Sequence, residues 1–238
     1  MLNIYITSAS KGEGKTFLTA GLAATMQSLG YTTSVYKPIQ TGGIEFNGFM
    51  QSPDLTVVKS VDPYINTHFS YLFKTKSEPL IAAENENQII DIDFINHEYQ
   101  KILNISDCTI LDGDRGILSP IAPNIQNIDL IKKLQIPLLF VISPSEDSIN
   151  NSLMSINIAQ EKGLDVRGVI INNITEDCSK MFLTASTRLI EEYTNTSILG
   201  LIPNIGKQIV PEEMITAILN GIDIESVFKV KIEKLDFN

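Results

Sequence analysis

The stretch Ser8–Thr16, SASKGEGKT, decides the fold class of this chain of 238 residues. It ends in the Gly-Lys-Thr of the phosphate-loop pattern G-x-x-x-x-G-K-[ST], with Ala9 at the position of the first glycine. The apolar run 2–7 comes before it, and residues 16–29, which have helical spacing, come after it, with Gly30 as a candidate C-terminal cap. This order predicts a nucleotide-phosphate site, although Ala9 leaves the backbone shape of the loop open.

The parts of this stretch suit different parts of a nucleotide. Backbone N–H groups and the positive end of the following helix attract phosphate oxygens. Lys15 would reach the β- and γ-phosphates, Thr16 would reach Mg²⁺, and Lys11 adds positive charge. The alternative is a strand–helix turn without a ligand. The predicted nucleotide-binding residues of this stretch are Lys11, Gly12, Glu13, Gly14, Lys15 and Thr16.

Short apolar runs alternate with helical patterns along the chain. The predicted strands are 2–7, 32–37, 108–113, 137–143, 166–173 and 197–203, and the predicted helices are 16–29, 91–104, 128–134, 148–162, 178–193 and 211–220. This alternation predicts an α/β fold of the P-loop NTPase type, in which helices cover both faces of a mostly parallel sheet. We expect one domain over residues 1–238, with residues 42–90 as a long excursion over the site.

Composition narrows the class of protein. The net charge of −10 and pI of about 4.7 argue against nucleic acid as a partner. The sequence contains no run of eighteen apolar residues, so we expect no membrane span. Two cysteines, Cys108 and Cys178, and no export signal favour free thiols in the cytoplasm. Only His68 and His97 could serve as histidine ligands, so a zinc site is not expected.

A second informative segment, YKPIQTG, covers residues 36–42. Pro38 disfavours continuing the strand, which places Lys37 at its carboxyl end. Ligands of open α/β sheets bind at that edge, so Lys37 would point into the same crevice as Lys15. A lone lysine at a strand end is more often solvated, and the pairing with the phosphate loop favours the functional interpretation.

The phosphate loop followed by YKP-x-x-(S/T)-G resembles the dethiobiotin synthetase family, whose phosphate loop usually opens with Gly-Thr where this chain has Ser8-Ala9. The resemblance implies ATP-dependent ring closure of a diamine, 7,8-diaminononanoate, with CO₂. A carbamate forms, ATP phosphorylates it, and the second amine attacks to close a cyclic urea. Lys15, Lys37 and Thr41 would be the catalytic residues. Lys37 would pair with the carbamate anion, and Thr41 would hydrogen-bond it.

The same resemblance implies a Mg²⁺ site and a place for the nucleotide base. Thr16, Asp54 in QSPDL and Asp112 in LDGDRG are oxygen ligands suited to Mg²⁺. For both aspartates, helix capping or a solvated strand end is the alternative. Asn172, within INN (171–173), and Pro203, within GLIPNI (200–205), would belong to the base site, although Asn173 could take the place of Asn172.

Two segments depart from the family pattern. Asp112-Gly113-Asp114-Arg115-Gly116 replaces a glycine-rich segment that usually begins with glutamate, and Asp114 and Arg115 either neutralise each other or contact the substrate. The loop 143–151 carries Glu146 and Asp147, where the family receives a substrate carboxylate across a homodimer interface. These carboxylates would stabilise a helix N-terminus, and they would repel that substrate group.

Two alternatives to the biotin reaction therefore stand. One is a related ATP-dependent ligase with a different amine or carboxylate acceptor. The other is a nucleotide switch of the ParA/MinD type, which would bind a partner protein. A switch ATPase carries a signature lysine where this chain has Ser10, and that difference disfavours it. The expected partners are a small diamine, CO₂, ATP, Mg²⁺ and a second copy of the chain.

Overall fold

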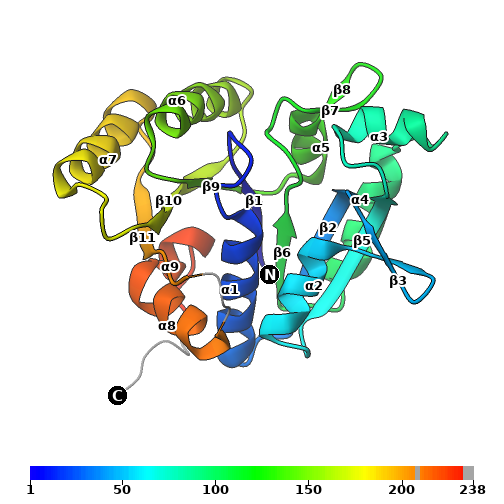
Figure 1. Cartoon of the computed structure of the whole chain (residues 1–238), viewed down its shortest axis with the longest axis horizontal. Helices are drawn as coiled ribbons and strands as arrows, with labels where there is room; N and C mark the ends of the chain where they lie inside the picture. The colour runs from blue at the N-terminus through cyan, green and yellow to red at the C-terminus, as the bar shows by residue number, and fades with distance from the viewer. Residues whose placement is uncertain (207–209, 233–238) are drawn as a thin grey trace.

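The computed structural model describes residues 1–206 and 210–232. Within them, seven parallel strands form one sheet in the order β11-β10-β9-β1-β6-β2-β5 (Figure 1). The strands are β1 (Leu2–Thr7), β2 (Thr33–Thr41), β5 (Asn66–Phe73), β6 (Cys108–Asp112), β9 (Leu138–Ile142), β10 (Val166–Ile174) and β11 (Ile198–Pro203). This confirms the predicted parallel α/β sheet of the P-loop NTPase type. The six predicted strands are all present.

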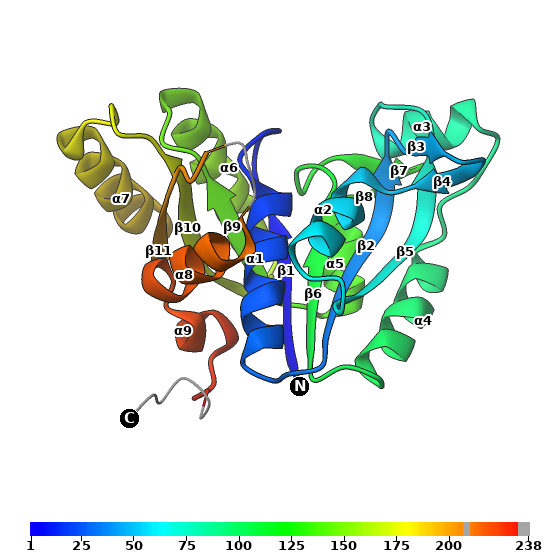
Figure 2. The same cartoon turned by 60° about the horizontal axis from the view of Figure 1, so that its bottom comes forward.

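Helices cover both faces of the sheet because the central strands are apolar on both sides. One face carries α1 (Lys15–Ser28), α2 (Pro53–Val61), α8 (Pro211–Gly221) and α9 (Ile224–Phe228), which share one apolar core (Figure 2). The other carries α3 (Pro79–Asn85), α4 (Ile92–Leu103), α5 (Asn127–Leu134), α6 (Glu146–Glu161) and α7 (Lys180–Thr194) over a second core. The six predicted helices correspond to α1 and α4–α8.

Two small antiparallel pairs lie outside the main sheet. One is the hairpin of β3 (Ile44–Phe46) and β4 (Phe49–Gln51), and the other joins β7 (Pro120–Ala122) to β8 (Ile125–Gln126). Cys108 and Cys178 are both free thiols. Among the described helices, none combines the length and the apolar character that crossing a membrane requires.

The segment 42–90 does more than cross over the site. It contains the hairpin, α2, the edge strand β5 and α3, so it contributes a seventh strand to the sheet. The apolar pattern does not predict β5, because its sequence, NTHFSYLF, mixes polar and apolar residues. Most side chains of this strand are partly or fully exposed. An edge strand packs on fewer sides than a central one, so it needs no continuous apolar run.

The prediction that Lys37 ends its strand is also wrong. The strand β2 continues through Pro38 to Thr41, so Lys37 lies in its middle. Pairing with β6 stops at Tyr36, and beyond it β2 pairs with β5 alone. Pro38 therefore lies where the strand has one free side, a position at which a missing N–H is tolerated.

The contribution of β5 can be tested with two phenylalanines on it. Phe73 is fully buried, whereas Phe69 is 48% exposed. We expect Phe73→Ala to lower the free energy of unfolding by about 3–5 kcal/mol, because it leaves a cavity in the core. Phe69→Ala should cost less than about 1 kcal/mol, since little apolar surface returns to water. Urea unfolding of both variants measures the difference, and equal losses would contradict the burial of Phe73.

Candidate active site

The site lies at the carboxyl edge of three neighbouring strands. The loop 8–14 follows β1 and leads into α1, and β6 ends at Asp112. Ile6 of β1 pairs with Asp112, and Tyr36 of β2 pairs with Leu111. This register brings Lys37, the residue after Tyr36, to the level of Asp112. Parallel pairing thus joins residues from three distant parts of the sequence at one edge.

The phosphate loop keeps the required backbone shape without a first glycine. The positive φ angles in the loop belong to Gly12 (86°) and Gly14 (92°), so Ala9 adopts none that would need glycine. A Cβ atom on Gly14 would lie 2.0 Å from the Asn172 side-chain nitrogen. Glycine at position 14 is therefore required by both its dihedral angle and the close packing of Asn172.

Lys15 is the first residue of α1, and its side chain is buried. Its ammonium group donates a hydrogen bond of 2.8 Å to the Ser8 hydroxyl, which in turn donates to the Ser10 carbonyl. Burial lowers the pKa of Lys15, and the nearby Asp112 carboxylate opposes that shift. An ammonium held across the loop by a neutral hydroxyl can exchange this contact for a phosphate oxygen.

Lys37 is held by the two predicted metal-ligand aspartates. Its ammonium lies 2.6 Å from Asp54 Oδ2 and 3.0 Å from Asp112 Oδ2, and it also donates to the Gly113 carbonyl at 3.3 Å. The Thr16 hydroxyl donates to the same Asp112 oxygen at 3.2 Å. Lys37 is 1% exposed. The predicted residues of the metal site thus converge, with Lys37 between the two carboxylates.

The charges of this cluster stabilise one another. Burial alone would lower the pKa of Lys37, but the carboxylates of Asp112 and Asp54 outweigh it and raise this pKa above its usual value. Burial would raise the pKa of Asp54, and the ammonium of Lys37 outweighs it, so this pKa is lowered. Asp112 is fully buried, which raises its pKa against the pull of Lys37. Lys37 is therefore an ionised partner that compensates the buried negative charge.

The donors in this cluster fit a Mg²⁺ ion. The second Asp112 oxygen, Oδ1, is buried and has no hydrogen-bond partner among the described residues. Asp54 is 27% exposed at its side chain, so it faces the open side of the site. The described part of the chain has no cluster of three or more His, Cys, Asp or Glu placed to hold a metal. Mg²⁺ does not need one, because it commonly takes one or two carboxylates and fills its shell with water and phosphate.

Asp54 is positioned by the start of α2, a helix that the sequence pattern did not predict. The Ser52 hydroxyl caps this helix by accepting from the Leu55 N–H, and Pro53 occupies the first turn. Ser52 also donates to the Gln40 side chain at 2.6 Å, which ties the helix start to β2. The sequence Ser-Pro-Asp was a usable signal, since serine caps followed by proline are typical of helix N-termini.

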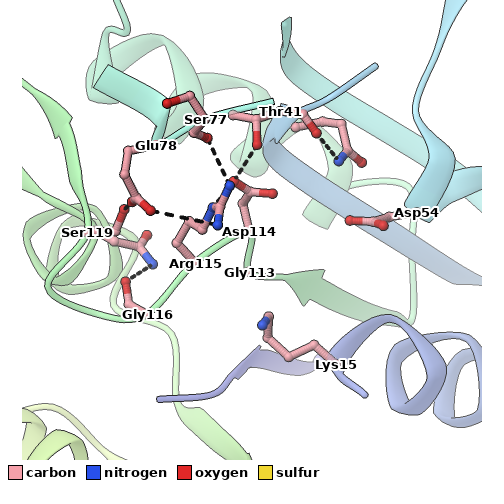
Figure 3. A network of polar contacts seen from close by, with 12 residues as sticks. Lys15, Thr41, Asp54, Ser77, Glu78, Gly113, Asp114, Arg115, Gly116 and Ser119 are labelled. Carbon is pink, nitrogen blue, oxygen red and sulfur yellow. Dashed lines mark hydrogen bonds and ion pairs between the residues drawn. The ribbon is translucent and has the colours of Figure 1, made fainter. Parts of the chain in front are cut away.

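A network around Arg115 forms the wall of the site facing Lys15 (Figure 3). Arg115 lies 3.5 Å from Asp114 and 3.7 Å from Glu78, and it donates to the Ser77 carbonyl at 3.0 Å. The Thr41 hydroxyl donates to Asp114 at 3.1 Å. All three guanidinium nitrogens are therefore engaged, which favours the mutually neutralising role for Asp114 and Arg115. Glu78, which had no sequence signal, also accepts a hydrogen bond from Ser119.

A cavity of about 160 Å³ separates this wall from the phosphate loop. Its lining includes Lys11 and Lys15 on one side, and Glu78, Asp114 and Arg115 on the other. The two lysines thus face two carboxylates and a guanidinium across a space beside the Lys15 ammonium. Such a space suits a small polar group that carries both an anionic and a cationic or amine function.

A second cavity, of about 270 Å³, lies on the other side of the phosphate loop. Gly12, Gly14, Asn172, Asn173 and Pro203 are among its lining residues. Asn172 is buried and donates to the Glu13 carbonyl at 3.0 Å, while its own oxygen has no partner among the described residues. The structure thus brings the predicted base-site residues together next to the phosphate loop. Their role toward a base stays a prediction.

The side chain of Glu13 does not face the phosphate position. Its carboxylate accepts from the Ser148 hydroxyl at 2.7 Å and from the Ser143 backbone N–H, and it is 4% exposed. Glu13 therefore fastens the phosphate loop to the start of α6. The exposed Glu146 and Asp147 lie in the first turn of α6, where carboxylates stabilise the helix.

The anchoring role of Glu13 leads to a stability prediction. We expect Glu13→Ala to lower the free energy of unfolding by about 1–3 kcal/mol, because the donors of Ser143 and Ser148 lose their buried acceptor. Glu146→Ala, at the exposed start of the same helix, is the matched control and should cost less than about 1 kcal/mol. Urea unfolding compares the two variants, and an equally small loss for Glu13→Ala would refute the anchor.

Comparisons with known proteins show which family the sequence resembles. The family model described as an AAA domain matches residues 2–212. An ATP-dependent dethiobiotin synthetase BioD of Bacillus cereus (strain G9842) is 27% identical over 215 residues, covering 90% of this chain and 88% of its own. The enzyme of that name from Methanococcus vannielii is 29% identical over 203 residues, covering 84% of this chain and 92% of its own.

Solved structures of similar shape belong to the P-loop ATPases. A ParA family ATPase from Chlorobium tepidum has a TM-score of 0.57 at 16% identity, covering 98% of this chain and 93% of its own. MinD of Aquifex aeolicus, in complex with MinC, has a TM-score of 0.56 at 18% identity, covering 92% and 88%. At this identity the likeness supports the fold alone.

Because the family model matches residues 2–212, the chain belongs to the family that the AAA-domain model describes. The two relatives confirm its resemblance to the dethiobiotin synthetases.

Proposed function

We propose that this protein is an ATP-dependent dethiobiotin synthetase, which joins 7,8-diaminononanoate and CO₂ into a cyclic urea at the expense of ATP. The observation that carries the proposal is the convergence of Lys15, Thr16, Lys37, Asp54 and Asp112 at one sheet edge. The relatives named dethiobiotin synthetase support the choice of reaction. The homodimer implied by the resemblance and the single domain expected from the sequence both stay predictions.

The first chemical step is the addition of CO₂ to one amine of the diamine, which gives a carbamate anion and releases a proton. In our proposal Lys37 and Thr41 hold the carbamate. Lys37 supplies a positive charge from β2, and Thr41, four residues further along the strand, supplies a hydroxyl now bonded to Asp114. A bound carbamate oxygen is then oriented for in-line attack on the γ-phosphate, and positioning is the main requirement of phosphoryl transfer.

Lys15 would neutralise negative charge that develops on the transferred phosphoryl group. Its ammonium is already inside the site and held by a neutral hydroxyl that it can release. Mg²⁺ bound by Thr16, Asp54 and Asp112 would supply Lewis-acid charge for the β- and γ-phosphates. The second amine then attacks the carbamoyl carbon, the ring closes, and phosphate leaves. We place the adenine in the cavity beside Asn172 and Pro203.

The decisive experiment measures phosphate release with Mg-ATP and bicarbonate, with and without 7,8-diaminononanoate. We expect release to depend on the diamine and to yield one cyclic urea per phosphate, detected by mass. ATP binding without diamine dependence would refute this acceptor and favour a related ligase. Slow hydrolysis that a partner protein stimulates would instead favour a ParA/MinD-type switch.

Substitutions of Lys15 and Lys37 should have different effects on ATP binding and phosphate release. Lys15→Ala should lower phosphate release at least about 10²-fold, because it removes charge stabilisation at the γ-phosphate. Lys37→Ala should still bind ATP and yet stop turnover, because the carbamate loses its cationic partner. Fluorescent ATP-analogue binding and phosphate release separate these effects. Full ATP hydrolysis by Lys37→Ala without diamine would contradict the role given to Lys37.

A substitution at the acidic start of α6 tests whether the carboxylate of the acceptor binds near this loop. We expect Asp147→Ala to leave ATP affinity unchanged, because Asp147 is exposed outside both cavities that flank the phosphate loop. The KM for the diamine should change, because the variant loses a carboxylate that would repel the carboxylate of the acceptor. Titration calorimetry gives the ATP affinity, and steady-state kinetics give the KM. A loss of ATP binding would contradict the assignment of this loop to the acceptor side.

A further inference from the structure

The Lys37 ammonium and the proposed Mg²⁺ would use the same two carboxylates. Lys37 contacts Oδ2 of Asp54 at 2.6 Å and Oδ2 of Asp112 at 3.0 Å. The Thr16 hydroxyl, the third proposed ligand, donates to that same Asp112 oxygen at 3.2 Å. The two carboxylates assigned to the metal thus contact an ammonium, and the Asp112 oxygen also accepts the Thr16 hydroxyl proton. A divalent cation added to this arrangement would meet a like charge at contact distance.

The acceptor also needs Lys37 in a different position. As long as both carboxylates hold the ammonium, its charge is neutralised and it offers little attraction to a carbamate anion. The cavity beside Lys15 is lined by Asp114, whose charge also acts on Lys37. Gly113, between Asp112 and Asp114, already accepts a hydrogen bond from Lys37 through its carbonyl. A rotation of the long lysine side chain past Gly113 would lead from the carboxylate pair toward that cavity.

We propose that the Lys37 ammonium and a divalent cation are alternative occupants of the Asp54–Asp112 pair, so that metal binding with nucleotide releases Lys37 to the acceptor. This inference rests on the proposed function, because it takes the metal site from it. Before the cation arrives, Lys37 compensates two carboxylates, one of them fully buried. With a divalent cation bound at Asp54 and Asp112, Lys37 would no longer be needed to compensate them. Nucleotide and metal therefore bind before the carbamate can be held.

The exchange predicts that Lys37 weakens metal binding. Mn²⁺ serves as the probe, and its free concentration is followed by electron paramagnetic resonance without nucleotide. We expect Lys37→Met to bind Mn²⁺ about tenfold more tightly than the natural protein, since one charge at this distance shifts a proton equilibrium by one to three units. Lys15→Met is the matched control, because Lys15 is a buried cation of the same site that donates to Ser8 rather than to a carboxylate. Its effect should be much smaller.

A second measurement uses the natural protein and does not depend on the folding of a variant. The ¹⁵Nζ resonance of Lys37 is followed by NMR in protein labelled with ¹⁵N-lysine. We expect it to keep its ion-paired position with ADP and a chelator, and to move when Mg²⁺ is added with ADP. A resonance that stays in place after Mg²⁺ has bound would overturn the exchange.

The outcomes separate this inference from the function on which it rests. If the natural protein binds no Mn²⁺ even with nucleotide, the metal site of the proposed function fails and the exchange fails with it. If Mn²⁺ binds the natural protein with nucleotide, but Lys37→Met binds it no more tightly and the Lys37 resonance does not move, only the exchange is overturned. Tighter binding in Lys37→Met alone, with little change in Lys15→Met, supports it.

Discussion

The buried contact of Lys37 with Asp54 and Asp112 is the interaction on which the site depends. It joins the middle of β2, the start of α2 and the end of β6, three segments that are far apart in the sequence. Removing one member of a buried ion pair commonly costs about 3–5 kcal/mol, because the remaining charge is left without compensation. The same contact therefore stabilises the ligand-free fold and keeps the proposed catalytic groups close together.

The phosphate loop depends on a second set of contacts, which come from the other half of the sheet. The Glu13 carboxylate reaches Ser143 and Ser148 after β9, and Asn172 at the end of β10 donates to the Glu13 carbonyl. Lys15 and Thr16 thus directly follow a loop that is braced from two neighbouring strands. A loop held in this way presents its N–H groups in place before a nucleotide binds, which lowers the ordering cost of binding.

Much of the site could be predicted from local sequence. The GKT motif fixes Lys15 and Thr16 at a helix start, and the YKP segment pointed to Lys37. The predicted position of Lys37 at the end of its strand was wrong, because β2 continues past Pro38 through its pairing with β5. The roles of Glu13 and Glu78 could not be predicted. Glu13 acts through residues at least 130 positions away in the sequence, and Glu78 contacts Arg115 and Ser119 across two loops.

The parallel α/β class and the phosphate loop could be predicted from the sequence alone, because the apolar period and the glycine pattern are local properties of the chain. The place of β5 at the edge of the sheet is evident only from the fold, since a half-exposed edge strand carries a weak sequence pattern. The fold likewise shows that Lys37 lies between Asp54 and Asp112 and that Asp114 lies beside Arg115. Those contacts depend on strand register and on helix placement, which short-range patterns do not specify.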